Sequence, residues 1–113
     1  MVRTDLSGPQ IAVQSAHAAI EVARSFSEEL EHPSVIIICG IDNEYKLQKQ
    51  LEHYQSQGIQ CKPFYEADLD NQLTSFATEP VFGETRRLFK HLQLLKQSDL
   101  NKCAFHSHKG GAK

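Results

Sequence analysis

The sequence contains no long apolar run, no cysteine framework and no glycine-rich phosphate loop. Its longest uninterrupted apolar stretch, Val35 to Cys39, is far shorter than the roughly 20 residues that a membrane-spanning helix needs. The cysteines, Cys39, Cys61 and Cys103, stand far apart without a C-x-x-C pair, which indicates free thiols in a reducing compartment. The first residues carry a charge at Arg3 and contain no apolar segment of the kind found in signal peptides. We therefore expect a cytoplasmic protein that has no membrane partner.

The composition is that of an ordinary folded domain. The chain has 113 residues, of which 40% are hydrophobic and 23% are charged, as in single globular domains. Its net charge of −2 is unevenly spread: residues 1–82 hold five Lys and Arg against twelve acids, and residues 83–113 hold seven against two. This asymmetry leaves two interpretations open, a basic face for a polyanion or a solvated helix followed by an unfolded tail.

Hydrophobic patterning predicts strands that alternate with helices. We expect strands at residues 2–6, 35–39, 59–66 and 81–83, helices at 10–30, 43–58 and 85–96, and a functional loop at 68–80. This order is typical of an α/β domain with a partly parallel sheet. The domain is expected to cover residues 1–97, and residues 98–113 are expected to form a disordered tail.

Apolar residues at helical spacing predict which side of each helix is buried. These faces would also permit a homodimer. The expected inward residues are Val13, Ala16, Ile20 and Ala23 in the first helix, Leu47, Leu51 and Tyr54 in the second, and Leu88, Leu92 and Leu95 in the last.

The first helix also carries a polar stripe, formed by Gln10, Gln14, His17 and Glu21. At about 100° per residue these side chains fall within an arc of ~60°. The stripe is either a plain solvated face or a row of hydrogen-bonding groups that lines a groove at the start of the helix, where free backbone N–H groups favour anions. A histidine among alanines is more often partly buried than a catalytic base.

Three acids, Glu66, Asp68 and Asp70, occupy alternate positions at the start of the expected loop. Clustered carboxylates repel one another, so one of them is a candidate for proton transfer. Equally, such residues are common turn formers. The sequence Cys103-x-x-His106-x-His108 lacks a second ligand pair, so we predict no metal site.

The segments 2–6 and 11–19 resemble the opening strand and first helix of the class II (archaeal and eukaryotic type) peptidyl-tRNA hydrolases. The resemblance extends over about residues 2–97. It implies a four-stranded mixed sheet flanked by helices, and hydrolysis of the peptide–tRNA ester without a metal or organic cofactor. The family motif Lys-x-x-x-Gln-x-x-His falls on Gln10, Gln14 and His17, so glutamine replaces the lysine.

The resemblance also implies roles for residues outside the first helix. A family aspartate falls on Asp68 and a later threonine on Thr78, while a further family threonine is replaced by Gln72. Asp68 would then orient or deprotonate water, Gln10 and Gln14 would hold the carbonyl, Thr78 would position the loop, and His17 would support the site. The exposed cations Arg86, Arg87 and Lys90 are the candidates for contacts with tRNA phosphates.

Three functions remain open from the sequence. The first is a peptidyl-tRNA hydrolase, weak or altered because losing one oxyanion donor costs about 10²–10³ in rate. The second is a catalytically silent module that binds RNA or protein. The third is an unrelated small-molecule enzyme on the same scaffold. The hydrolase interpretation predicts that Gln10, Gln14, His17, Asp68 and Thr78 converge around one cleft.

Overall fold

The computed structural model describes residues 1–26 and 36–102 of the chain. The strands are β1 (Val2–Arg3), β2 (Cys39–Ile41), β3 (Cys61–Glu66), β4 (Gln72–Thr78) and β5 (Gln93–Leu94). The α-helices are α1 (Gly8–Ser25), α2 (Glu44–Ser56) and α3 (Gln97–Leu100), and two 3₁₀ helices are η2 (Ala67–Leu69) and η3 (Gly83–Phe89). None of the helices within the described residues is long and apolar enough to cross a membrane.

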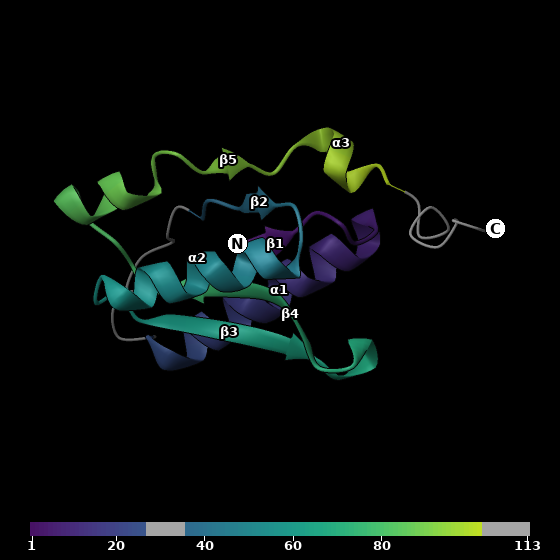
Figure 1. Ribbon diagram of the computed structural model, residues 1–113, viewed down its shortest axis with the longest axis horizontal. Coiled ribbons are helices and arrows are strands. Elements are labelled where there is room, and N and C mark those ends of the chain that lie inside the picture. The colour runs from purple at the N-terminus through teal and green to yellow at the C-terminus, as the bar shows by residue number, and fades with distance from the viewer. Residues whose placement is uncertain (27–35, 103–113) are drawn as a thin grey trace.

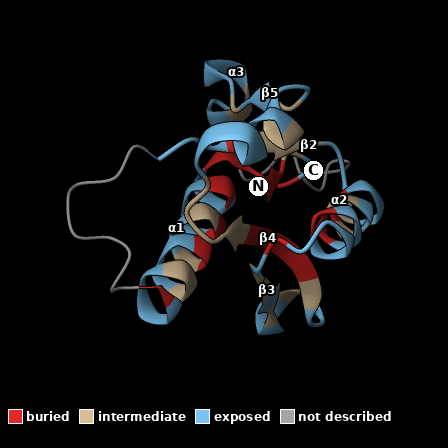
Figure 2. Ribbon diagram, turned by 90° about the vertical axis from the view of Figure 1, so that its left-hand side faces the viewer, coloured by how far each residue is buried: buried red, intermediate tan, exposed pale blue. Residues whose placement is uncertain are grey.

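The five strands form one mixed sheet in the order β3-β4-β1-β2-β5 (Figure 1). Strands β1 and β2 pair in parallel, and the other neighbours pair antiparallel. Helices α1 and α2 lie on opposite sides of β4, with their buried sides toward it (Figure 2). The described residues therefore form a single α/β domain, as predicted, with five strands instead of the expected four.

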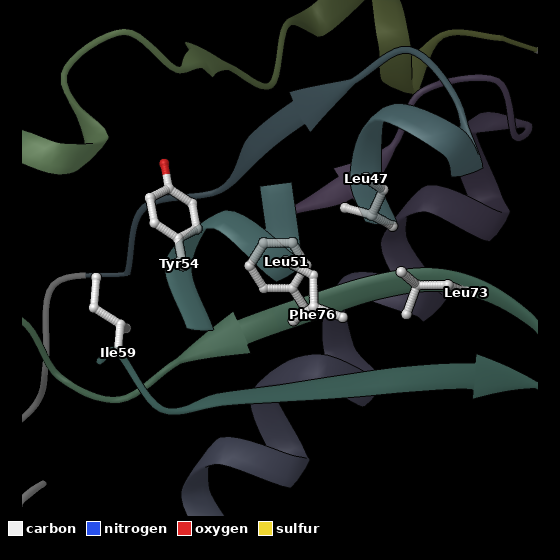
Figure 3. Packing of buried hydrophobic residues seen from close by; sticks show 6 residues of the cluster. All are labelled: Leu47, Leu51, Tyr54, Ile59, Leu73 and Phe76. Atoms are coloured by element: carbon white, nitrogen blue, oxygen red, sulfur yellow. The ribbon is translucent and has the colours of Figure 1, made fainter. Parts of the chain in front are cut away.

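The larger hydrophobic cluster lies between α2 and the sheet. Leu47, Leu51 and Tyr54 are buried at helical spacing, as predicted. They pack against Ile59, Leu73 and Phe76 (Figure 3). The side chain of Asn43 accepts a hydrogen bond from the Lys46 amide and so caps the helix. The sequence pattern of this helix is thus sufficient to predict both its bounds and its buried face.

Helix α1 faces the sheet with a different side from the one predicted. Val13 and Ile20 are 50% and 53% exposed, and the other two residues of the predicted stripe, Ala16 and Ala23, are exposed as well. The buried side chains are Ile11, Gln14 and Ala18. The alanine-rich stripe offers little area to bury, whereas the opposite side combines one large aliphatic residue with a glutamine that hydrogen-bonds to β4.

The segment expected to be a functional loop contains the strand β4. This strand lies between β3 and β1, and its residues 73–76 are buried. Thr74 and Ser75 are buried polar residues between the apolar Leu73 and Phe76, so the sequence shows no strand-like alternation. Hydrogen bonds to α1 satisfy both hydroxyl groups, which is what permits their burial.

The last third of the domain also departs from prediction. Residues 81–83 form no strand: Phe82 is 72% exposed and precedes η3. The expected helix at 85–96 is replaced by η3 and β5, which pairs antiparallel with β2. The prediction of inward leucines is nevertheless confirmed, because Leu88 and Leu92 pack against the α2 cluster and Leu95 packs against the cluster around Ile11.

The second predicted strand, 35–39, is shifted toward the carboxyl terminus. Strand β2 begins at Cys39, and the preceding isoleucines 36–38 are exposed. Gly40 pairs with Val2, and an added Cβ at Gly40 would come within 2.6 Å of the Thr4 methyl carbon. The glycine therefore allows the close approach of the chain after β1.

The predicted tail begins with an ordered segment. Helix α3 is followed by Lys102, whose carbonyl accepts a hydrogen bond of 2.9 Å from the Gly8 amide. A Cβ added at Gly8 would collide with the Leu100 carbonyl oxygen, so glycine is required at that position. The rest of the predicted tail, 103–113, and the predicted end of the first helix, 27–30, lie outside the described residues.

Candidate functional site

A β-bulge in β4 allows two adjacent residues of this strand to contact α1. Phe64 pairs with Ser75 and Tyr65 pairs with Leu73, so Thr74 is the extra residue on its strand. A bulge of this kind interrupts the alternation of side chains. Thr74 and Ser75, although adjacent in sequence, consequently both reach the same helix.

Gln14 is the residue on which these contacts converge. Its side-chain oxygen accepts a hydrogen bond of 2.6 Å from the Thr74 hydroxyl, and its backbone oxygen accepts one of 2.8 Å from the Ser75 hydroxyl. Its side-chain nitrogen donates to a carboxylate oxygen of Glu66 at 2.8 Å. Gln14 is only 3% exposed, so its amide holds β3 and β4 against α1 and is not free to bind a substrate carbonyl.

Glu66 is the carboxylate that faces the polar stripe. It is the last residue of β3 and half-buried, and its second oxygen accepts a hydrogen bond of 3.3 Å from the Asp68 amide. The hydrogen bond from Gln14, followed by the one from the Asp68 amide and the proximity of His17, lowers the pKa of the Glu66 carboxyl. Glu66 is therefore ionised at neutral pH, with lone pairs left for a further donor.

His17 lies one turn along α1 from Gln14, stacked on the ring of Phe64. The two ring centres are 4.2 Å apart and the planes differ by 8°. The side chain is half-buried, in agreement with the expectation of a partly buried histidine. Stacking fixes the plane of the imidazole ring beside Glu66.

Three contacts show how α1 is oriented relative to β3. Gln14 contacts Glu66, His17 contacts Phe64, and Lys62 lies 5.9 Å from the ring of Phe26. The helix thus runs antiparallel to β3, with the first helical turns at the sheet edge where β3 ends. Gln10 is exposed one turn before Gln14, on the same side of the helix.

Asp68 and Thr78 do not join Gln14 and His17 as the resemblance implied. Asp68 is exposed in η2, and it is its backbone amide that contacts Glu66. Thr78 pairs with Cys61 at the far end of β4, whereas Gln72 pairs with Glu66. At ~3.3 Å per residue, Thr78 lies about 20 Å along the strand from Gln72. The expected convergence of the predicted residues is therefore wrong for Thr78.

The start of α1 offers no free anion-binding donors among its first described amides. The Gly8 amide donates to the Lys102 carbonyl, and the Gln10 amide donates to the Ser7 hydroxyl oxygen. Pro9 has no amide hydrogen, and the Ile11 amide donates to the Ser7 carbonyl. The interpretation of the helix start as an anion site is corrected by these contacts, which satisfy the amides of the first turn.

The predicted tRNA contacts lie away from Glu66. Arg86, Arg87 and Lys90 are exposed, on and just after η3. That helix packs on the carboxyl-terminal end of α2, where the Tyr54 hydroxyl donates to the Leu88 carbonyl. In Figure 1 the helical turns of η3 lie at the left end of the molecule, and the turn that follows β3 lies at the right. Any RNA that contacts both would run along the molecule.

One buried charge at the same sheet edge has no counterpart in the sequence prediction. Arg3, on β1, is 7% exposed. Its guanidinium donates two hydrogen bonds of 2.9 Å to the two carboxylate oxygens of Asp5 and one of 2.9 Å to the Gln72 side chain. The sequence signal for this ion pair is the i, i+2 spacing of Arg3 and Asp5 in the predicted strand 2–6, which places both side chains on one face. This cluster fixes the start of β4 next to Glu66.

Within residues 1–26 and 36–102 no group of three or more His, Cys, Asp or Glu side chains is arranged to hold a metal ion. Cys103, His106 and His108 lie outside the described residues. No protein-family model and no curated protein sequence matches the chain.

Proposed function

We propose that this protein hydrolyses the ester bond of peptidyl-tRNA in the cytoplasm, with Glu66 as the carboxylate that orients the attacking water. The observation that carries the proposal is the contact of Glu66 with Gln14, beside His17 (both residues of the motif that resembles the class II hydrolases). Asp68, the acid that the resemblance implied, contacts this group only through its backbone amide.

The chemistry follows from the state of each group. An ionised Glu66 accepts a hydrogen bond from water and takes its proton as the water oxygen bonds to the ester carbonyl carbon. The proton then passes to the ribose oxygen as the ester bond breaks. Because the pKa of Glu66 is lowered, it is a weak base, which favours slow turnover.

The developing oxyanion needs a donor that is not already engaged. The Gln14 amide is used within the protein, whereas the exposed Gln10 amide lies one turn away. A neutral amide stabilises an oxyanion less than a lysine ammonium does. The proposed enzyme is accordingly a weak hydrolase, and it uses no metal or organic cofactor.

A purified peptidyl-tRNA tests the proposal directly. We expect Glu66→Gln to lower the initial rate of ester release by about 10²-fold or more, because the amide cannot take a proton. Asp70→Asn is the matched control: Asp70 is exposed with a positive φ of 54°, which asparagine tolerates, and its rate should equal that of the wild type. Equal rates for Glu66→Gln and the wild type would contradict the proposal.

A second candidate is a binding module without catalysis on the same fold. The specific observation in its favour is that both ends of the Gln14 amide are occupied by protein partners. It predicts background ester release from the wild type together with salt-sensitive tRNA binding. The same assay, combined with a binding titration, separates the two candidates.

A further inference from the structure

A groove of about 420 Å³ separates α2 from the chain that joins η3 to β5. Its volume falls within the range of about 300–1,000 Å³ that is usual for ligand sites. It lies on the side of the sheet covered by α2, away from α1. Its lining consists of Ile41, Lys46, Lys49, Gln50, His53 and His91.

One wall of the groove is a cationic face of α2. Lys46, Lys49 and His53 follow one another at i, i+3 and i+7, so they share one side of the helix. Lys46 forms an ion pair of 2.7 Å with Asp42, and Lys49 forms one of 3.9 Å with Glu52. Both pairs are exposed, and exposed pairs contribute little. The ammonium groups can therefore exchange these carboxylates for an incoming anion.

The other wall continues into the basic turn η3. His91 is exposed, and its ring nitrogen lies 3.3 Å from the Gln50 side-chain nitrogen across the groove. Directly before it, Lys90 follows the exposed Arg86 and Arg87. Stacking of Tyr54 on Phe89, with ring centres 4.4 Å apart, holds η3 against α2. The exposed cations of η3 are consequently held beside the carboxyl-terminal end of α2.

The amino-terminal end of α2 lies beside the start of β4. Helix α2 begins at Glu44, whose carboxylate accepts a hydrogen bond of 2.8 Å from the Leu73 amide. Leu73 follows Gln72, the residue paired with Glu66. A helix of this length spans about 20 Å. The two lysines therefore lie between η3 and the end of the sheet where Gln72 pairs with Glu66, on the face of the sheet opposite to α1.

We infer that this groove holds the phosphodiester backbone of an RNA strand. A groove lined by lysines can hold a chain of phosphates, and such grooves commonly add an aromatic side chain on which bases stack. Tyr45 does not line the groove but lies against one of its lysines: its ring is 70% exposed, and the Lys49 ammonium lies 5.4 Å from its centre. The inference extends the proposed function, since it specifies where the RNA part of the substrate lies, but RNA binding can be measured without the ester.

Fluorescence anisotropy of a labelled single-stranded oligoribonucleotide, repeated over a series of salt concentrations, tests this assignment. We expect the double variant Lys46→Gln/Lys49→Gln to bind at least about tenfold more weakly. The slope of log K against log salt should also fall in magnitude by about 1.4, or ~0.7 for each phosphate that the variant no longer neutralises. Lys62→Gln is the matched control, since it removes one positive charge near Phe26 on the α1 side. Its affinity should stay within about twofold of the wild type.

Unchanged affinity in the double variant, or an equal loss per charge in Lys62→Gln, would overturn the inference. Complete displacement of the RNA by an equal charge concentration of polyglutamate would also overturn it, because the groove would then select carboxylates. The outcome for the ester reaction is separate. A lysine-dependent RNA affinity of the wild type without ester release would refute only the proposed hydrolysis.

Discussion

The hydroxyl of Thr74 donates a 2.6 Å hydrogen bond to the side-chain oxygen of Gln14 in the buried interface between α1 and β4. Both residues are buried. Because a buried polar group without a partner is costly, this pair ties the position of the helix to the bulge in the strand. The hydrogen bond therefore affects both the stability of the fold and the placement of Glu66.

Substitution of Thr74 measures the contribution of this hydrogen bond. We expect Thr74→Val, which keeps the shape but leaves the Gln14 oxygen unpaired, to lower the free energy of unfolding by about 1–3 kcal/mol. Urea denaturation measures the change. Thr78→Val is the control, since its hydroxyl bonds only to the neighbouring Glu79 carbonyl and should have a much smaller effect. Similar decreases in both variants would argue against a special role for the buried pair.

The pH dependence of stability reports on Glu66. Its folded-state pKa is below the ordinary value of 4.5, so ionised Glu66 contributes stability above the unfolded-state pKa that is lost as pH falls through the folded-state pKa. We expect the stability of the wild type relative to Glu66→Gln to decrease on acidification through this range. Carboxyl NMR titration of Gln14→Leu should show the Glu66 pKa moving up. An unmoved value would remove Gln14 as the main cause.

The thiol of Cys61 provides a chemical test of burial. Burial raises the pKa of Cys61 to about 11 and also raises the pKa of Cys39. Because the thiolate is the reactive form, we expect iodoacetamide to alkylate both cysteines slowly at neutral pH and much faster in denaturant. Mass spectrometry of the digested protein gives the rate for each site. Fast alkylation of Cys61 in the folded protein would contradict its placement.

Restoring the cation of the hydrolase motif tests how far the proposed activity is limited by Gln10. We expect Gln10→Lys to raise the rate of peptidyl-tRNA hydrolysis by about 10-fold or more, since one good oxyanion donor contributes about 10²–10³. Gln10 is exposed, so stability should be unchanged. If the wild type shows only background release and Gln10→Lys restores turnover, the natural protein is not an enzyme of this class.

Sequence patterns predict those parts of the fold in which apolar spacing determines packing. The stripe of Leu47, Leu51 and Tyr54 indicates the position of α2, and Pro63 marks β3 as an edge strand, because proline cannot donate to a ladder. The patterns fail where hydrogen bonds determine packing. Thr74 and Ser75 have the composition of a loop, and only the pairing of their hydroxyl groups with α1 explains why they are buried in a strand.

The candidate site shows the same division. Gln14 and His17 are recognised from their helical spacing, and in the structure both side chains contact β3 from the same face of α1. Glu66 is one of three candidate acids that the sequence does not separate, because only the end of β3 determines which carboxylate faces the helix. A role for Thr78 was implied only by the family resemblance. The antiparallel register of β3 and β4 pairs Thr78 with Cys61, far from the end of β3 that carries Glu66.

The bond between the Gly8 amide and the Lys102 carbonyl joins the first helix to the last described residues. This hydrogen bond couples the two segments: opening of the segment after β5 frees an amide in the first turn of α1, less than two turns before Gln14. Truncation near residue 97 would thus be felt at Glu66 on the opposite flank of the sheet, and hydrogen exchange at Gly8 would be its earliest sign.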